Sequence, residues 1–444
     1  MLVFISDLHF VDGTAGEHNI PCRAFDYFFD DLVAIANRPT NKGKIKEIKV
    51  ILLGDIFDLL RTEEWFEPTI TESQRPWGSK DQGQKTEENA LAILNKIADH
   101  KNEEKGVDNA RALELLRNRL PELKEQCELD YAPILEYIPG NHDRLVNKPE
   151  FSKLRKRVRE CLGLVTEKDP LFPRLFLDPD YGVLARHGHE FDKYNYEGGT
   201  SFTEEDYQQV PIGDPITTEL IARLPFELAN QLKNVRPLTD AQKARIIENF
   251  QEIENVRPFS AVIEWLVYQV KQTTQLKETI EDTVDTVIKR FNELNFVKAW
   301  YERHDKWLDP FDEADKIQAV LYLLEKFKVF PMEKLLSLAM KAQTFFYKDD
   351  LLEAVPDEFF FDSRLRYVVH GHTHDPLVMP IRAPRTAEQI YLNTGTWRGR
   401  YTKATRDGSF VSWKNMTYVI FYQPAERGTP FPVFETWTGT LKTV

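Results

Sequence analysis

The chain of 444 residues has 42% hydrophobic and 29% charged residues, which is typical of a folded, water-soluble protein of one or two domains. It contains no run of about 18 apolar residues, which excludes a membrane-spanning helix, and Met1 leads into an apolar segment without the basic region of a signal peptide. A net charge of −13 disfavours a dedicated nucleic-acid binder, and the scattered Cys22, Cys127 and Cys161 indicate reduced thiols, so we expect a cytoplasmic protein.

The first predicted element is a buried strand over residues 2–5, where large apolar residues follow one another. Asp7 and His9 come soon after it, and residues two apart project to the same side of an extended chain. Since α/β folds bind ligands at the carboxyl ends of their strands, the pair is compatible with a binding site. Taken alone, it is equally compatible with a turn that contains an aspartate and an incidental histidine.

Four later apolar runs end in the same abrupt way. Strands are predicted over 48–53, 134–138 and 367–369, with a shorter one before the segment "RHGHE". The residues at or just beyond their ends include Asp55, Asn141 and six histidines: His142, His187, His189, His370, His372 and His374. Each residue alone has an ordinary structural explanation, but five strands that all end in this way indicate one shared site.

Helices are predicted between these strands. Apolar residues have helical spacing over 23–37, 87–100 and 110–127, and the alternation of strands and helices predicts an α/β fold. The polar loop over 63–85 is predicted to be either a disordered segment or a flap that faces the substrate. Asp214 follows a glycine as Asp55 does, but Pro215 after it indicates the N-cap of a helix rather than a ligand.

From residue 194 to residue 357 the chain changes character. Apolar residues recur every three or four positions over 262–294, which predicts one long amphipathic helix or two in series, and 312–330 and 331–346 repeat the pattern. We therefore expect a core of 1–193 and 358–444 and a helical insertion of 194–357. The insertion is expected to cap the site, or to form an oligomer interface through its aromatic residues, Trp265, Tyr268, Trp300, Tyr301 and Trp307.

The residues at the strand ends offer carboxylate, amide and imidazole ligands without thiolates. Such sets suit zinc, manganese, iron, nickel or cobalt. They are too many for a single ion, whereas two ions that share a carboxylate fit the number. Two ions about 3.5–4 Å apart stabilise both the attacking and the leaving oxygen of a phosphoryl displacement, so the residues alone point to metal-dependent phosphoryl chemistry.

The motifs "DLH", "GDIFD", "GNHD", "HGH" and "GHTH", in this order, resemble the signature of the calcineurin-like metallophosphoesterases. The resemblance covers about residues 1–62, 130–192 and 361–400, with "YLNTGTW" similar to the closing strand of that family. It implies an αββα sandwich, here with a large all-helical insertion. It also implies hydrolysis of a phosphoester by a metal-bridging hydroxide, with a small or medium phosphodiester or pyrophosphate as substrate.

The resemblance further implies two divalent cofactor ions, with manganese expected first and iron, zinc, nickel or cobalt as alternatives. His189 is an alternative to His187 as a ligand, although the His-Gly pattern of the family favours His187, and His370 is expected to be structural. The implied ligands are Asp7, His9 and His374 for the first ion, Asn141, His187 and His372 for the second, and Asp55 for both.

The catalytic residues implied in the same way are His142 and Asp143. His142 would face the substrate and protonate the leaving oxygen, Asp143 would orient His142, and Asp58 would support the site from behind. Arg144 and Arg398 are expected to bind the phosphate of the substrate. Each arginine is equally compatible with an ordinary ion pair.

Two alternatives remain beside the phosphoesterase. A nuclease of the same family is possible but not favoured, because the chain is acidic and lacks a basic stripe. A binding scaffold without turnover would be expected to lose ligands or the "GNHD" histidine, and both are present here. A protein Ser/Thr phosphatase is disfavoured because "DLL" stands where those enzymes carry Asp-Arg-Gly.

Overall fold

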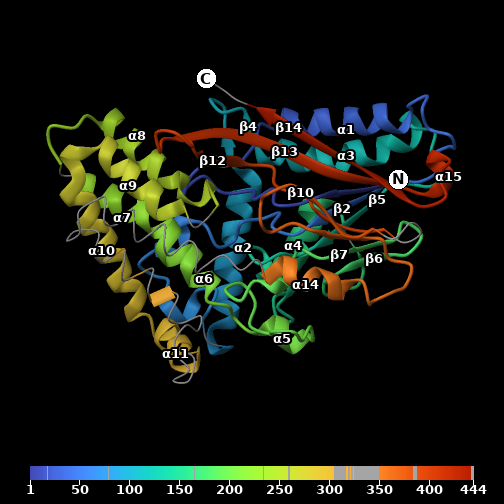
Figure 1. The fold of residues 1–444 in the computed structure, drawn as a ribbon. Coiled ribbons are helices and arrows are strands. Elements are labelled where there is room, and N and C mark those ends of the chain that lie inside the picture. Colours follow the sequence, from blue (N-terminus) through green and yellow to red (C-terminus); the bar gives the residue numbers. More distant parts are fainter. Residues whose placement is uncertain are drawn as a thin grey trace.

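The computed structural model describes residues 1–17, 19–78, 80–164, 166–233, 235–258, 261–304, 317–318, 321, 324, 350–383 and 388–441. In this part of the chain the protein is a mixed α/β structure with a seven-stranded, a five-stranded and a two-stranded sheet (Figure 1). The predicted α/β class is therefore confirmed. The two large sheets position the candidate site, and the small one is the hairpin of β3 (Lys101–Asn102) and β4 (Val107–Asp108).

The seven-stranded sheet has the order β5-β2-β1-β13-β12-β8, with β14 paired to β13. Strands β1, β2 and β5 are parallel, so their carboxyl ends lie at one edge, and β13 runs antiparallel to β1. The strands are β1 (Leu2–Ile5), β2 (Lys49–Leu53), β5 (Ile134–Ile138), β8 (Val256–Arg257), β12 (Gly399–Lys403), β13 (Phe410–Tyr422) and β14 (Val433–Leu441).

The five-stranded sheet has the order β10-β11-β9-β7-β6. Strands β7, β9 and β11 are parallel, and their carboxyl ends again share an edge. One apolar cluster joins the two sheets face to face: Phe4 and Ile51 of the first sheet pack with Val183, Val369 and Leu392 of the second. The strands are β6 (Phe176–Asp178), β7 (Val183–Ala185), β9 (Tyr367–His370), β10 (Leu377–Arg382) and β11 (Gln389–Asn393).

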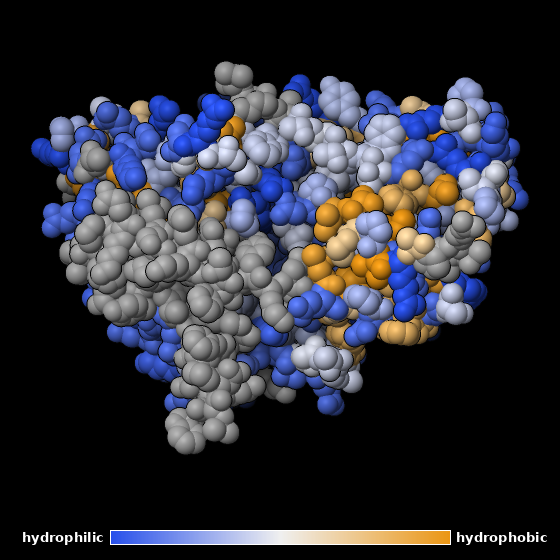
Figure 2. Space-filling model, in the orientation of Figure 1, coloured by the Kyte–Doolittle hydropathy of each residue, from blue (hydrophilic) through white to orange (hydrophobic). Residues whose placement is uncertain are grey.

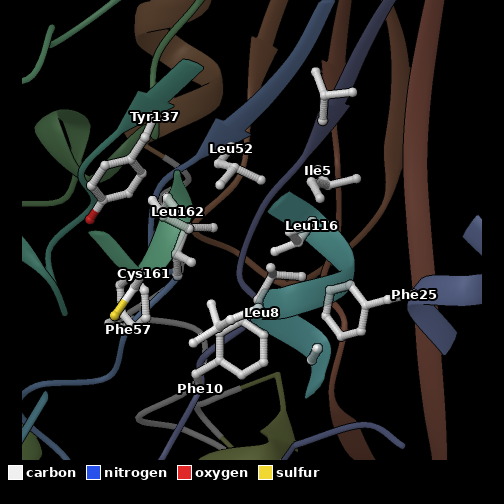
Figure 3. Close-up of a cluster of buried hydrophobic side chains, with 14 of the residues drawn as sticks. Ile5, Leu8, Phe10, Phe25, Leu52, Phe57, Leu116, Tyr137, Cys161 and Leu162 are labelled. Atoms are coloured by element: carbon white, nitrogen blue, oxygen red, sulfur yellow. The ribbon is translucent and has the colours of Figure 1, made fainter. Parts of the chain in front are cut away.

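Helices cover the outer faces of both sheets. On the first sheet, side chains from alternate strand positions, such as Ile5 and Leu52, pack with Phe25 of α1 and Leu116 of α3 (Figure 3). On the second, α14 (Asp350–Glu358) contributes Val355 to a cluster with Leu184 and Val368 of the strands. The helices that pack with the first sheet are α1 (Arg23–Ala36), α2 (Gly83–Asp99), α3 (Asn109–Gln126) and α4 (Ser152–Leu162).

The predicted insertion has an apolar core of its own. It includes Trp265 and Trp300, whose side chains are fully buried, so these two aromatic residues do not form the predicted oligomer interface. The segment over 262–294 forms two helices in series. Of the helix predicted over 312–330 only residues 317–318, 321 and 324 are described, and these are helical, whereas Trp307 and the helix predicted over 331–346 lie outside the described residues. The helices are α5 (Glu204–Gln208), α6 (Gly213–Pro215), a π-helix (Ile216–Ala222), α7 (Arg223–Leu232), α8 (Asp240–Gln251), α9 (Val262–Gln272), α10 (Lys277–Glu293) and α11 (Asn295–His304).

The region is not entirely helical, which corrects the expectation of an all-helical insertion. Strand β8 lies within it and pairs in parallel with β12, with Val256 opposite Tyr401. The loop over 63–85 also ties the two cores together, because Trp65 is buried in the core beneath the first sheet and Trp77 in that of the helices. Arg75 of the same loop forms a buried ion pair with Glu219. The helical region is thus joined to the sheet core by both strand pairing and side-chain packing.

Apolar surface gathers over β10 on the face shown in Figure 2. β10 is the edge strand of the five-stranded sheet, and its Leu377 and Val378 are exposed. An exposed apolar edge strand is open to pairing with another chain. Within the described residues, no helix is both long enough and apolar enough to cross a bilayer.

Candidate metal centre

The candidate site lies in the loops that follow β1, β2, β5, β7 and β9. Of the six non-glycine residues with positive φ in the described chain, five lie in these loops: Asp7 (52°), His9 (44°), Asp55 (52°), His372 (67°) and His374 (62°). Such conformations cost on the order of 1–3 kcal/mol each and concentrate at functional sites. The backbone hydrogen bonds from Asp7 N to Gly54 O (3.0 Å) and from His9 N to Asp55 O (2.9 Å) hold the first two loops together.

Asp7, His9 and His374 form the first group of potential ligands. His374 Nε2 lies 3.1 Å from His9 Nε2 and 3.2 Å from Asp7 Oδ1, and Asp55 Oδ2 lies 3.7 Å from His9 Nε2. Asp7 Oδ1 is buried and accepts no hydrogen bond from the described residues. Ligands about 2.0–2.2 Å from one ion in tetrahedral or octahedral geometry stand roughly 3–3.6 Å apart, so these spacings fit a divalent ion.

Asp55, Asn141, His187 and His372 form the second group. His187 Nε2 lies 3.1 Å from Asp55 Oδ2 and 3.2 Å from Asn141 Oδ1, and Asn141 Oδ1 lies 3.1 Å from His372 Nδ1. Asp55 thus belongs to both groups, as the sequence predicts for a bridging ligand. The structure brings all seven predicted ligand residues together.

Hydrogen bonds fix the orientation of the imidazoles. His187 Nδ1 donates to Leu53 O (2.9 Å), which leaves Nε2 free to point at Asp55. His9 Nδ1 contacts Asp58 Oδ2 (3.0 Å), and His372 Nε2 contacts Asp192 Oδ2 (2.9 Å). Sequence reasoning missed Asp192, because its position three residues after His189 in "HEFD" carries no signal of a contact with another strand.

His189 and His370 lie beside the centre rather than in it. The ring of His189 packs against Tyr196 and Tyr207, and burial lowers its pKa to about 4. His370 stacks on Phe191, and burial lowers its pKa to about 3. The structure therefore places His187, and not His189, among the ligand groups and leaves His370 in a structural position.

Opposite charges dominate the electrostatics of the buried ligands. Burial alone would lower the pKa of His187, but the neighbouring Asp55 raises it to about 10. Burial alone would raise the pKa of Asp55, but His187, His142 and His9 hold it below its usual range. These carboxylates and imidazoles attract cations and protons alike, which is the electrostatic setting of a metal site.

His142 is oriented by Asp58, and not by Asp143 as predicted. Asp58 Oδ1 lies 2.8 Å from His142 Nδ1 while its other oxygen contacts His9, so one buried carboxylate holds both rings. Asp143 accepts hydrogen bonds from Ile56 N (2.8 Å) and Gly140 N (2.6 Å). Its side chain turns back into its own loop and fastens that loop to the neighbouring one, so its role is structural.

Arg144 is held in an ion pair and does not face the centre. Its Nε donates to both oxygens of Asp214, at 3.1 and 3.0 Å, and both side chains are buried. The prediction that Arg144 binds phosphate is therefore wrong for this arrangement. Asp214 is also not an N-cap, since Ile212 occupies that position, and its carboxylate serves Arg144 instead.

Two residues of the helical region reach the site. Glu254 Oε1 lies 3.6 Å from His142 Nε2, and Arg257 Nη2 lies 2.6 Å from His374 Nδ1. The other predicted phosphate ligand, Arg398, is fully buried and donates from Nη2 to Glu254 Oε2 (3.2 Å). Sequence reasoning missed Glu254 and Arg257, because nothing in a helical segment shows which distant strand it contacts.

Neither models of known protein families nor curated protein sequences match this chain. Three clusters of histidine and aspartate side chains are close enough to hold an ion: Asp7, His9 and His374; Asp55, His187 and His372; and His9, Asp58 and His142. Their oxygen and imidazole donors, which include no sulfur, fit divalent ions of the manganese-to-zinc series.

Proposed function

We propose that this protein is a dinuclear metal-dependent phosphoesterase of the calcineurin-like kind, acting on a phosphodiester or a pyrophosphate. The observation that carries the proposal is the convergence of seven residues from five strand ends into two groups that share Asp55. The layer order of helices, sheet, sheet and helix is consistent with the sandwich that the motifs imply.

Residues 1–193 and 358–444 would form the catalytic core, and 194–357 a cap. The contacts of Glu254 with His142 and of Arg257 with His374 support this division of roles, because they bring the helical region to the site. A region that reaches the site can restrict which substrates enter it and exclude water from the reaction.

In this proposal Asp7, His9 and His374 would hold one ion, Asn141, His187 and His372 the other, and Asp55 both. When bound, a pair of divalent ions activates water and neutralises charge on a phosphoryl group. The chain would supply the proton through His142, whose Nδ1 contacts Asp58 Oδ1 (2.8 Å) and whose Nε2 lies 3.6 Å from Glu254 Oε1.

His142 can carry that proton because of its neighbours. Burial would lower the pKa of His142, but Asp58, Asp55 and Glu254 raise it to about 10. The protonated ring can donate from Nε2 to a departing oxygen. His142→Ala should then reduce turnover by about 10²–10⁴-fold.

The proposal is tested by metal analysis of the purified protein and by activity on a chromogenic monoester, a chromogenic diester and a diphosphate diester, in manganese and in zinc. His142→Ala should keep both ions, and its loss of turnover should shrink for p-nitrophenolate, which departs without a proton. His370→Phe is the matched control, since it removes a buried histidine outside the ligand groups. Absence of metal-dependent hydrolysis in wild type, or equal losses for good and poor leaving groups, would contradict the assignment.

A further inference from the structure

Beside His142, one buried carboxylate lies between two buried arginines. Glu254 Oε2 accepts a hydrogen bond from Arg398 Nη2 (3.2 Å) and another from Arg61 Nη1. Its second oxygen, Oε1, is the atom that faces His142 Nε2. Two arginines and the His142 ring therefore surround a single carboxylate, which is contributed by the helical region.

Arg398 has more hydrogen-bonding capacity than Glu254 uses, whereas Arg61 also donates from Nη2 to Gln251 O (2.7 Å). Nε and Nη1 of Arg398 are buried and donate to no group among the described residues. A guanidinium matches the geometry of a phosphate through pairs of parallel N–H donors, and leaving such donors buried and unused is costly. The arrangement thus suits an oxyanion with more acceptor atoms than a carboxylate.

We propose that Arg61 and Arg398 bind an anionic group of the substrate beside His142, and that Glu254 occupies this place until the substrate displaces it. This inference rests on the proposed function, in which His142 faces the leaving oxygen. An anion on that side belongs to the leaving group, so the substrate class is a diphosphate whose departing half is itself a phosphate.

The reaction is then the hydrolysis of a phosphoanhydride. The oxygen of water forms a bond to the attacked phosphorus, and the bond from that phosphorus to the bridging oxygen breaks. The electron pair of the broken bond stays on the bridging oxygen, which leaves with the second phosphate. One proton of the water stays on the attacked phosphate and the other is released and is available to the departing phosphate, so the products are two phosphates.

Solvent exposure distinguishes Glu254 from Glu219, a similarly placed carboxylate elsewhere in the molecule. Glu219 also lies among arginines, in ion pairs with Arg75 and Arg223 and 3.8 Å from Arg290 Nε, but its own side chain is 0% exposed. The side chains of Glu254 and His142 are 10% and 9% exposed, so the place they share touches solvent. Glu219→Gln is therefore a comparison variant: it frees arginines that contact Glu219 and not Glu254, and one of them, Arg75, lines a separate pocket of about 390 Å³.

The first test measures anion binding by calorimetry on metal-free protein at fixed ionic strength. The probes are inorganic phosphate and methylenediphosphonate, whose P–C–P bridge cannot be hydrolysed. Glu254→Gln should bind methylenediphosphonate at least about tenfold more tightly than wild type, the effect of one charged hydrogen bond. Adding Arg398→Gln should abolish the gain, whereas any gain in Glu219→Gln should survive Arg398→Gln.

An unchanged or weaker affinity in Glu254→Gln would overturn the inference, as would a gain that survives Arg398→Gln. If Glu254→Gln does not fold, Arg398→Lys in the otherwise wild-type chain replaces it. Lysine cannot form the paired donors, so methylenediphosphonate should raise the unfolding temperature less than in wild type. An equal rise would overturn the inference.

The second test uses the metal-loaded protein and compares kcat/KM for a diphosphate diester with that for a p-nitrophenyl diester. Arg398→Gln should lower the ratio at least about tenfold, and an unchanged ratio would reject the diphosphate as substrate class. Because anion binding is measured without metal or turnover, a failure of the proposed phosphoesterase activity leaves the first test readable. The two ideas therefore fail separately.

Discussion

Replacing Asp55 by asparagine tests the shared carboxylate directly. Oδ2 of Asp55 lies 3.1 Å from His187 Nε2 and 3.7 Å from His9 Nε2, while Oδ1 accepts a hydrogen bond from His142 N (2.8 Å). Asparagine can keep its oxygen on the backbone N–H of residue 142. Its amide group then faces the two histidines and cannot act as a ligand, so the variant should fold and still fail to bind two ions.

The size of the expected stabilisation by metal follows from the linkage between ligand binding and folding. A ligand at 100 times its dissociation constant stabilises the folded state by about 2.7 kcal/mol per site, and two independent sites by about twice that. We expect manganese to raise the free energy of unfolding of wild type by an amount of this order and that of Asp55→Asn by little. Chemical denaturation with and without metal measures the difference, and metal analysis gives the number of bound ions.

Asp214→Asn is the control for this experiment. It removes the carboxylate that Arg144 contacts, and breaking a buried ion pair costs on the order of 3–5 kcal/mol, yet both ions should still bind. The two variants thus separate loss of stability from loss of metal. Two ions bound to Asp55→Asn at wild-type affinity would refute the bridging assignment.

Three further outcomes are expected. His370→Phe should change the free energy of unfolding by less than about 1.5 kcal/mol and keep metal binding, because the buried ring makes no hydrogen bond among the described residues; loss of metal would make it part of the site. Arg144→Met should destabilise the fold, and Arg144→Met with Asp214→Leu should recover most of the loss, as measured by denaturation; no recovery would show that the ion pair itself is needed. The His100–Glu17 pair should stabilise the folded state by less than about 1 kcal/mol, and His100→Gln should remove this contribution from the free energy of unfolding measured across pH.

The pH range in which the His100–Glu17 pair stabilises the fold follows from the pKa shifts of the two residues. The hydrogen bond to Glu17 raises the pKa of His100 above 6.5, so this contribution is complete below 6.5 and is lost as pH rises through the raised value. Burial would raise the pKa of Glu17, but His100 lowers it below 4.5, so this contribution is complete above 4.5 and is lost as pH falls. Wild type and His100→Gln should differ most between about pH 4.5 and 6.5, and a difference that is constant from pH 4 to 9 would contradict the pairing.

The position of the ligands could be predicted from sequence because it depends on local pattern. Buried strands are recognisable as apolar runs, and the carboxyl ends of parallel strands meet at one edge of a sheet. Residues just beyond those ends, such as Asp7 and Asp55, are therefore neighbours whatever the rest of the fold does. The same reasoning applies separately to the ligand residues of each sheet, whereas the meeting of the two sets depends on how the sheets pack through their shared apolar cluster.

The partners of these residues could not be predicted in the same way. Whether Asp58 or Asp143 contacts His142 depends on side-chain rotamers inside two tight loops, and both spacings were compatible with the contact. The approach of Glu254 depends on how a segment about 110 residues farther along the chain packs, and no local pattern encodes that. Strand β8 has only two residues, too few to show the alternation that identifies a strand.

The candidate centre contains features that oppose folding and that the proposed divalent ions would offset. Five of its residues hold positive φ, each at a cost on the order of 1–3 kcal/mol. His9 Nε2 and His374 Nε2 lie 3.1 Å apart, and the buried Asp7 Oδ1 accepts no hydrogen bond from the described residues. The free energy lost to this geometry must be offset by packing elsewhere. The cluster of apolar side chains between the two sheets can contribute that stabilisation. Bound ions would return part of that energy, so metal affinity and fold stability should rise and fall together in variants of these five residues.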